Sequence, residues 1–213
     1  MGQFELLIAT RNEGKVNELR EAFAGLPATL RFLPEFTNIS EVAEIGKTYE
    51  ENATLKAAGY YDQIGIIALA DDSGLEVDAL SGGPGVLSAH FGGDHLSDVE
   101  RTRALLTVLD GVAAPARTAR FVSCMVLYGT LPGKPRELLQ PQVLAITHGV
   151  CEGSLVNEPM GSNGFGFDPI FIPDGYHTPF AALDQVVKRK ISHRARAAEL
   201  MRQQLEQRIL AQT

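Results

Sequence analysis

Short apolar runs alternate with longer amphipathic segments along this chain. The runs end at polar positions, as strands do, and the segments carry apolar residues three or four positions apart, as helices do. Strands are predicted at residues 3–10, 29–33, 65–71, 119–131 and 142–156, and a short strand ends a loop at 161–173. Helices are predicted at residues 12–26, 48–64, 97–111 and 192–209. With no repeat and no linker, the pattern predicts one α/β domain over 1–213 with mixed strands.

Local signals support these boundaries. Thr48 with Glu51 forms a capping-box pattern at the start of one helix, and Gly111 ends another. The strands at 119–131 and 142–156 are expected to pair across the turn "PGKP". Polar clusters recur where strands become loops, and ligands bind at those edges in α/β folds.

Composition narrows the function classes. The chain has 213 residues, 45% of them hydrophobic, and a formal net charge of −7. An acidic balance argues against general binding to nucleic acid or acidic membranes, but not against a small anion held locally. No apolar run approaches the roughly 18 residues of a membrane span, and no signal-peptide core is present. We therefore expect a cytoplasmic protein in which Cys124 and Cys151 are buried free thiols.

Two adjacent aspartates follow the apolar run of 65–71. Asp71 and Asp72 in "ADDSG" are expected at the carboxyl end of that strand, where their repulsion calls for a nearby positive charge. Paired carboxylates are typical ligands of hard metals, and Mg²⁺ takes one or two of them together with phosphate oxygens. The alternative is a turn in which one aspartate caps and the other is solvated.

"TRNEGK", residues 10–15, lies between the first predicted strand and helix. A helix start offers free N–H groups to a phosphate, although the P-loop spacing is absent. The alternative is a surface helix start with Asn12 as its N-cap and Lys15 solvated.

Two further segments favour recognition of a base. Glycines in "GSNGFGFD" let Phe165 or Phe167 stack on a flat ligand, whereas the alternative places both rings in the core. "KRKISHRARA", beginning at Lys188, offers donors to base or phosphate oxygens, or else is a solvated helix start. The remaining histidines make no ligand pattern and are taken as structural or surface residues: His90, His95, His148 and His177.

Six motifs together resemble one family. They are "LLIATRNEGKVNEL", "YEENATLKA", "ADDSGLEVDAL", "GGPGVLSAHF", "GFGFDPIF" and "ISHRARA". Their order resembles the inosine triphosphate pyrophosphatases, which act on non-standard purine nucleoside triphosphates, over residues 4–200. The resemblance implies an elongated two-lobed α/β fold with a central mixed β-sheet, flanking helices and a substrate cleft between the lobes. It also implies a cytosolic homodimer that requires Mg²⁺ and hydrolyses ITP, dITP and XTP to the nucleoside monophosphate and pyrophosphate.

The resemblance also implies roles for individual residues. Asp72 matches the catalytic, metal-associated acid, Glu44 the second metal carboxylate and Ser73 a substrate contact. The triphosphate is gripped by the "TRNEGK" motif, namely Thr10, Arg11, Asn12, Glu13, Gly14 and Lys15. The base is bound by Phe165, Gly166, Phe167 and Asp168, and read by Lys188, His193 and Arg194.

Three positions depart from the family pattern. His90 and Met160 stand where arginine is common, and Ala182 stands where glutamate is usual.

Three other functions are weighed against the main one. A pyrophosphatase for modified pyrimidine nucleotides, as in the Maf-like group, lacks the intact "SHR" and "FGFD". A nucleotide sensor without turnover gains little from paired acids. A plain interaction domain does not explain six ordered motifs.

Overall fold

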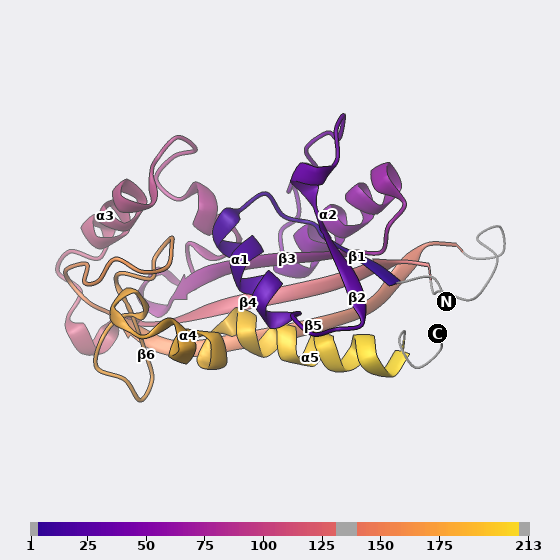
Figure 1. Cartoon of the computed structure of the whole chain (residues 1–213). Coiled ribbons are helices and arrows are strands. Elements are labelled where there is room, and N and C mark those ends of the chain that lie inside the picture. Colours follow the sequence, from indigo (N-terminus) through magenta and orange to yellow (C-terminus); the bar gives the residue numbers. More distant parts are fainter. Residues whose placement is uncertain (1–3, 131–139, 209–213) are drawn as a thin grey trace. The chain divides into compact units, whose positions relative to one another are not determined.

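The computed structural model describes residues 4–130 and 140–208 (Figure 1). Its strands are β1 (Phe4–Ile8), β2 (Ala28–Phe32), β3 (Ala68–Val77), β4 (Thr118–Gly129), β5 (Gln142–Leu155) and β6 (Phe171–Pro173). Its α-helices are α1 (Glu13–Ala22), α2 (Tyr49–Ile64), α3 (Asp98–Val108), α4 (Gln185–Ile191) and α5 (His193–Arg208).

The six strands form one sheet in the order β2-β1-β3-β4-β5-β6. β1 runs parallel to β2 and to β3, and β5 runs antiparallel to β6. The predicted α/β fold with a mixed sheet is therefore confirmed, as is the pairing of β4 with β5. The predicted turn at 132–135 lies outside the described residues.

The chain divides into two compact units. Unit 1 comprises residues 1–72, 123–149 and 196–213, and unit 2 comprises residues 73–122 and 150–195. Both units are discontinuous in sequence because β3, β4 and β5 each contribute residues to both. The single domain over 1–213 and the cleft between two lobes stay predictions.

In unit 1, alternate strand residues face two different helix layers. Leu6, Ile8 and Leu69 pack with residues of α1 and α5. Leu7 and Ala70 point to the opposite face and pack with α2. This alternation is the period of two expected of strands that are buried on both faces.

Unit 2 has a core of its own, rich in phenylalanine. Phe121 of β4 contacts Phe171 of β6 edge to face at 4.7 Å, and Phe180 packs on both. Leu105 from α3 and Leu75 from β3 complete this cluster. Aromatic pairs at such distances contribute beyond the area they bury.

Capping chemistry sets the helix starts as predicted. Thr48 and Glu51 form the capping box of α2, and Ser97 with Glu100 forms that of α3. Asn12 caps α1 by accepting a hydrogen bond from the Lys15 N–H at 3.0 Å.

Several predicted boundaries differ from the structure, and the largest difference is at β3. Asp71 and Asp72 do not end their strand, since β3 continues from Ala68 to Val77. Leu75 and Val77 beyond the aspartates are fully buried in the core of unit 2, so burial extends the strand through two charged residues. The short helix α4 had no predicted counterpart. The inner face of α5 is confirmed at Ala198, Met201 and Leu205, whereas Ile209 lies outside the described residues.

Both cysteines are buried thiols, as predicted. Burial, with Glu50 and the two aspartates adding repulsion, raises the pKa of Cys124 to about 12. Among the described residues, no helix is long and apolar enough to cross a membrane.

Candidate active site

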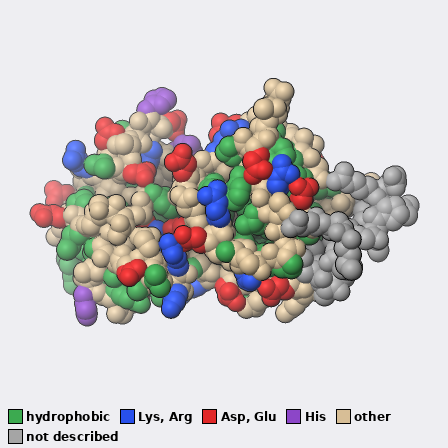
Figure 2. Space-filling view, viewed as in Figure 1, with side chains coloured by type: hydrophobic (Ala, Val, Ile, Leu, Met, Phe, Trp, Pro, Cys, Tyr) green, Lys and Arg blue, Asp and Glu red, His purple; other side chains and the backbone are tan. Residues whose placement is uncertain are grey.

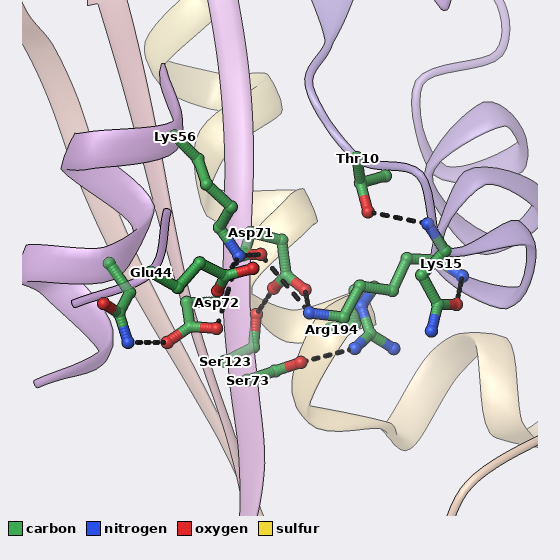
Figure 3. A network of polar contacts seen from close by, with 11 residues as sticks. Thr10, Lys15, Glu44, Lys56, Asp71, Asp72, Ser73, Ser123 and Arg194 are labelled. Atoms are coloured by element: carbon green, nitrogen blue, oxygen red, sulfur yellow. Dashed lines mark hydrogen bonds and ion pairs between the residues drawn. The ribbon is translucent and has the colours of Figure 1, made fainter. Parts of the chain in front are cut away.

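Asp71 is fully buried on β3 and is surrounded by donors from other elements of unit 1. The Lys15 ammonium lies 2.9 Å from its Oδ2 atom, and the hydroxyl of Ser123 on β4 donates to its Oδ1 atom (Figure 3). A lysine at the start of α1 therefore supplies the positive charge that a buried carboxylate requires.

Asp72 has a different set of partners, which come from α2. Lys56 Nζ lies 3.3 Å from its Oδ1 atom, and Asn52 Nδ2 donates to Oδ2 at 3.2 Å. Lys56 also lies 2.7 Å from Glu44 Oε2 and donates to the Asp71 carbonyl at 2.9 Å (Figure 3). The ammonium of Lys56 thus lies between the two carboxylates that the resemblance assigns to a metal.

Burial shapes the protonation of this cluster. It raises the pKa of Asp72 above the ordinary value, against the opposing attraction of Lys56 and Lys15. Burial alone would lower the pKa of Lys56, but Asp72 and Glu44 raise it above the usual value. The cluster therefore keeps Lys56 protonated, whereas burial destabilises the ionised form of Asp72.

The donor set suits a hard divalent cation. Three carboxylates, Glu44, Asp71 and Asp72, surround two lysines, so negative charge exceeds positive charge locally. Oxygen ligands of this kind are those that Mg²⁺ prefers, and the cation would offset the excess.

The six residues of "TRNEGK" have unequal surroundings. Thr10 is buried, and its Oγ1 atom accepts from the Asn12 N–H at 3.2 Å. Lys15 reaches the aspartates, whereas Arg11 and Glu13 are exposed and Gly14 is half-buried. The motif therefore brings one cation to the carboxylates and leaves the first turn of α1 accessible. Asn12 thus caps α1, while Lys15 pairs with Asp71 instead of being solvated.

Lys56 and Asn52 were missed by sequence reasoning. Both lie on α2, four residues apart, so they share one helix face. A lysine between the buried Ala53 and Ala57 is the signal that could have singled out Lys56. Ser123 carried no such signal, because its role depends on where β4 lies beside β3.

A second polar cluster lies within unit 2 and is built on a buried lysine. Lys188 of α4 is only 3% exposed and pairs with Asp168 Oδ2 at 2.5 Å. Its ammonium also lies 5.0 Å from the centroid of the Phe165 ring. The Phe165 N–H donates to the same Asp168 oxygen at 2.9 Å.

His193 and Arg194 begin α5 and are also buried. The imidazole of His193 stacks on Phe121, with the centroids 4.7 Å apart. Arg194 Nη2 donates to Ser73 Oγ at 2.7 Å (Figure 3). Its guanidinium lies 5.5 Å from the Phe165 centroid. A solvated helix start is thus wrong for Lys188, His193 and Arg194, although it describes the exposed Arg189 and Lys190.

The two phenylalanines of the glycine-rich loop differ. Phe167 is 4% exposed and belongs to the core of unit 2, whereas Phe165 is half-buried beneath two cations. Gly166 between them is held by α3 at both of its backbone polar groups. Its N–H donates to Asp98 Oδ2 at 2.6 Å, and its carbonyl accepts from Thr102 Oγ1 at 3.2 Å.

Charged side chains of both signs are mixed on the face that Figure 2 shows. On the described part of the face in Figure 2, Lys and Arg side chains are interspersed with Asp and Glu and form no continuous basic patch.

Comparison with known proteins shows the family of this chain. A model of the Ham1 family matches residues 6–204. The chain belongs to the Ham1 family. It is 41% identical over 193 residues to a dITP/XTP pyrophosphatase of Vibrio vulnificus, covering 91% of this chain and 92% of that protein. It is 38% identical over 208 residues to a dITP/XTP pyrophosphatase of Bacillus anthracis, covering 98% and 99%.

A solved structure agrees with the Ham1 assignment. The structure of a HAM1 protein from Coxiella burnetii superimposes with a TM-score of 0.81 at 35% sequence identity, covering 95% of this chain and 98% of that chain. The three departures noted in the sequence all lie at exposed positions of unit 2: His90, whose Nδ1 lies 2.8 Å from Asp94, Met160 and Ala182.

Proposed function

We infer that this chain is a dITP/XTP pyrophosphatase, which hydrolyses non-standard purine nucleoside triphosphates to the nucleoside monophosphate and pyrophosphate. The family relationship supports this reaction class. The observation that carries it in this molecule is the buried pair Asp71 and Asp72, each compensated by a lysine from a different helix. A plain structural role does not require two carboxylates and two lysines in one place.

The residues of unit 1 are assigned to the phosphate chemistry. Water attacks the α-phosphorus and pyrophosphate leaves. Asp72 orients the water and accepts its proton, a role suited to a carboxylate whose pKa is raised. Lys15, and the free N–H groups at the start of α1 near Gly14, stabilise the charge on the leaving group.

Asp72 and Glu44 would hold Mg²⁺. When bound, this cation neutralises phosphate charge as it develops. Lys56 bridges the same two carboxylates and keeps them close together before the substrate arrives.

The residues of unit 2 are assigned to the base. Phe165 stacks on the purine, while Lys188, His193 and Arg194 donate toward the oxygen at C6 of hypoxanthine or xanthine. Adenine carries an amino group there and would leave a buried donor unpaired. Such a donor costs about 1–3 kcal/mol, which gives a bias of about tenfold to hundredfold per contact.

Three further properties are proposed from the family resemblance. The chain forms a homodimer, works in the cytoplasm and acts as a single domain. A dimer is testable by light scattering of the purified protein.

A nucleotide panel tests the proposed function. Pyrophosphate release is measured with ITP, XTP, dITP, GTP and ATP at matched concentrations, with Mg²⁺ and with a chelator. We expect release from the first three with Mg²⁺ and loss of release with the chelator. Equal rates with ATP would refute the base selectivity. Binding of ITP without release would favour a sensor, and preference for pyrimidine nucleotides would favour a different pyrophosphatase.

A further inference from the structure

A second group of potential metal ligands lies in unit 1, apart from the carboxylates described above. Glu50, Cys124 and His148 each offer one ligand atom, and these three atoms lie within 4.8 Å of one another. His148 Nε2 and Glu50 Oε2 are 3.9 Å apart. The group contains a thiol, an imidazole and a carboxylate, so its chemistry differs from that of the acidic cluster around Asp72.

Strand register explains why the thiol and the imidazole meet. Two contacts define the pairing of β4 with β5: Arg120 Nε with Glu152 Oε2 (3.1 Å), and the Leu155 N–H with the Arg117 carbonyl (2.9 Å). Both belong to one antiparallel register, and counting along it places Cys124 opposite His148. Residues opposite each other project to the same face of the sheet with their Cβ atoms about 4.5–5.5 Å apart.

The helix α2 supplies the third ligand. Cys124 belongs to the core cluster that packs against α2, and Glu50 lies in the first turn of that helix. Register and helix packing thus bring together three residues that are 24 to 98 positions apart in sequence. Neither the spacing of the cysteines nor that of the histidines could have indicated this.

The group opens onto a pocket of about 770 Å³, which Glu50 and His148 help to line. Their side chains are 54% and 57% exposed, respectively, whereas Cys124 is fully buried. The two exposed ligands therefore line the pocket, and the buried thiol lies within 4.8 Å of both. An ion bound there would have three protein ligands and one position facing solvent in the pocket.

We propose that Glu50, Cys124 and His148 bind a zinc-class divalent cation at a site separate from the proposed magnesium site. Sulfur, imidazole nitrogen and carboxylate oxygen are the ligands that Zn²⁺ takes, and three of them leave a fourth position open. Mg²⁺ prefers oxygen ligands alone and is selected against by the sulfur.

The three ligand atoms lie within 4.8 Å of one another and must move closer together to bind an ion. A tetrahedral zinc ion holds neighbouring nitrogen and oxygen ligands about 3.3 Å apart. The observed 3.9 Å between His148 Nε2 and Glu50 Oε2 shortens by rotation of two exposed side chains. Cys124 stays in its strand, and its thiol proton passes to solvent as the sulfur–metal bond forms.

Cobalt absorption tests the proposal directly, because a Co²⁺–thiolate bond gives a charge-transfer band in the near ultraviolet. Metal-free full-length protein is titrated with Co²⁺ without Mg²⁺. We expect this band with one Co²⁺ per chain, together with the visible bands of four-coordinate Co²⁺, and displacement of both by Zn²⁺. Cobalt on the carboxylates near Asp72 would give no sulfur band.

Matched variants separate the site from other sulfur atoms. Cys124→Ala should abolish the band, whereas Cys151→Ala removes the other buried cysteine and should keep it. His148→Gln and Glu50→Gln change exposed side chains and should weaken Co²⁺ binding at least tenfold. Zn²⁺ should raise the unfolding temperature of the native protein and of Cys151→Ala, but not of Cys124→Ala.

Three results would overturn the proposal. They are absence of the band in the native protein, its survival in Cys124→Ala, and its loss in Cys151→Ala when that variant remains folded. Unchanged affinity in both His148→Gln and Glu50→Gln would also refute it, even if Cys124→Ala did not fold.

Discussion

The polar clusters of the two units differ in which charge is in excess. In unit 1, Glu44, Asp71 and Asp72 surround two lysines, whereas in unit 2 a single carboxylate, Asp168, accompanies two cations. The two cations of the cluster in unit 2, Lys188 and Arg194, lie over the Phe165 ring. Excess carboxylate suits a hard cation and phosphate, and excess cation beside a ring suits a flat base with carbonyl oxygens. The chemistry of each cluster thus indicates which part of a nucleotide it would bind.

Replacement of Asp72, the proposed general base, is expected to have the largest effect. Asp72→Asn keeps the shape of the side chain but removes its charge and its capacity to accept a proton. We expect the rate of pyrophosphate release from ITP to fall about 10²- to 10⁴-fold, in line with loss of a general base. Asp110→Asn on the surface is the matched control. Full activity in Asp72→Asn would remove that residue from the chemistry.

The two loop phenylalanines form a matched pair for unit 2. Phe165→Leu removes a half-buried ring, and since stacking contributes about 1–3 kcal/mol per base, KM for ITP should rise about tenfold to hundredfold. Phe167→Leu changes a core residue and should lower the unfolding temperature instead, with KM little affected. Steady-state kinetics and thermal unfolding of both variants distinguish the role of Phe165 from that of Phe167. The reverse pattern would mean that Phe167 contacts the base.

A smaller effect is expected where α3 holds the loop. Thr102→Val removes the hydroxyl that donates to the Gly166 carbonyl while keeping the side-chain volume. One hydrogen bond contributes about 0.5–1.5 kcal/mol, so KM should rise by about tenfold or less with kcat nearly unchanged. Thr107→Val is the control, because that hydroxyl donates within α3, to the Arg103 carbonyl. Equal effects in both variants would contradict a positioning role for Thr102.

The subtlest prediction concerns stability and pH. Since burial raises the pKa of Asp72 above its ordinary value of 3.8, the folded state binds more protons than the unfolded state just above pH 3.8. Stability of the native protein therefore falls as the pH rises through that window. The full loss of stability is reached above the raised pKa. Asp72→Asn should unfold at a higher temperature than the native protein at pH 7. This difference in unfolding temperature should vanish below pH 3.8.

Thermal unfolding across this pH range, with Asp110→Asn as control, measures the effect. A lower unfolding temperature of Asp72→Asn at pH 7 would show that the native ion pairs outweigh the cost of burial.

Local chemistry made much of the fold predictable. Capping at Thr48 and Ser97 and the apolar period of α5 depend on residues within a turn or two of each other. β3 was predicted too short because two charged residues locally resemble a strand end. Its continuation depends on Leu75 and Val77 meeting a core formed by distant segments.

The same division applies to the candidate site. Asp72 and Lys15 stood in motifs that the sequence displays, and Lys15 reaches the aspartates as a positive charge was expected to do. Lys56 and Ser123 did not stand out, because their roles depend on α2 and β4 packing beside β3. The burial of Lys188 was equally unpredictable, since it depends on an ion pair with Asp168, twenty positions away.

The most direct test compares ITP with ATP in two variants, one from each cluster. The ratio of kcat/KM for ITP to that for ATP is measured for the native protein, Asp72→Asn and Arg194→Met. If unit 1 serves the phosphates and unit 2 the base, Asp72→Asn lowers both values and keeps the ratio, whereas Arg194→Met lowers the ratio about tenfold or more. A ratio that falls in Asp72→Asn, or that stays unchanged in Arg194→Met, would contradict this division.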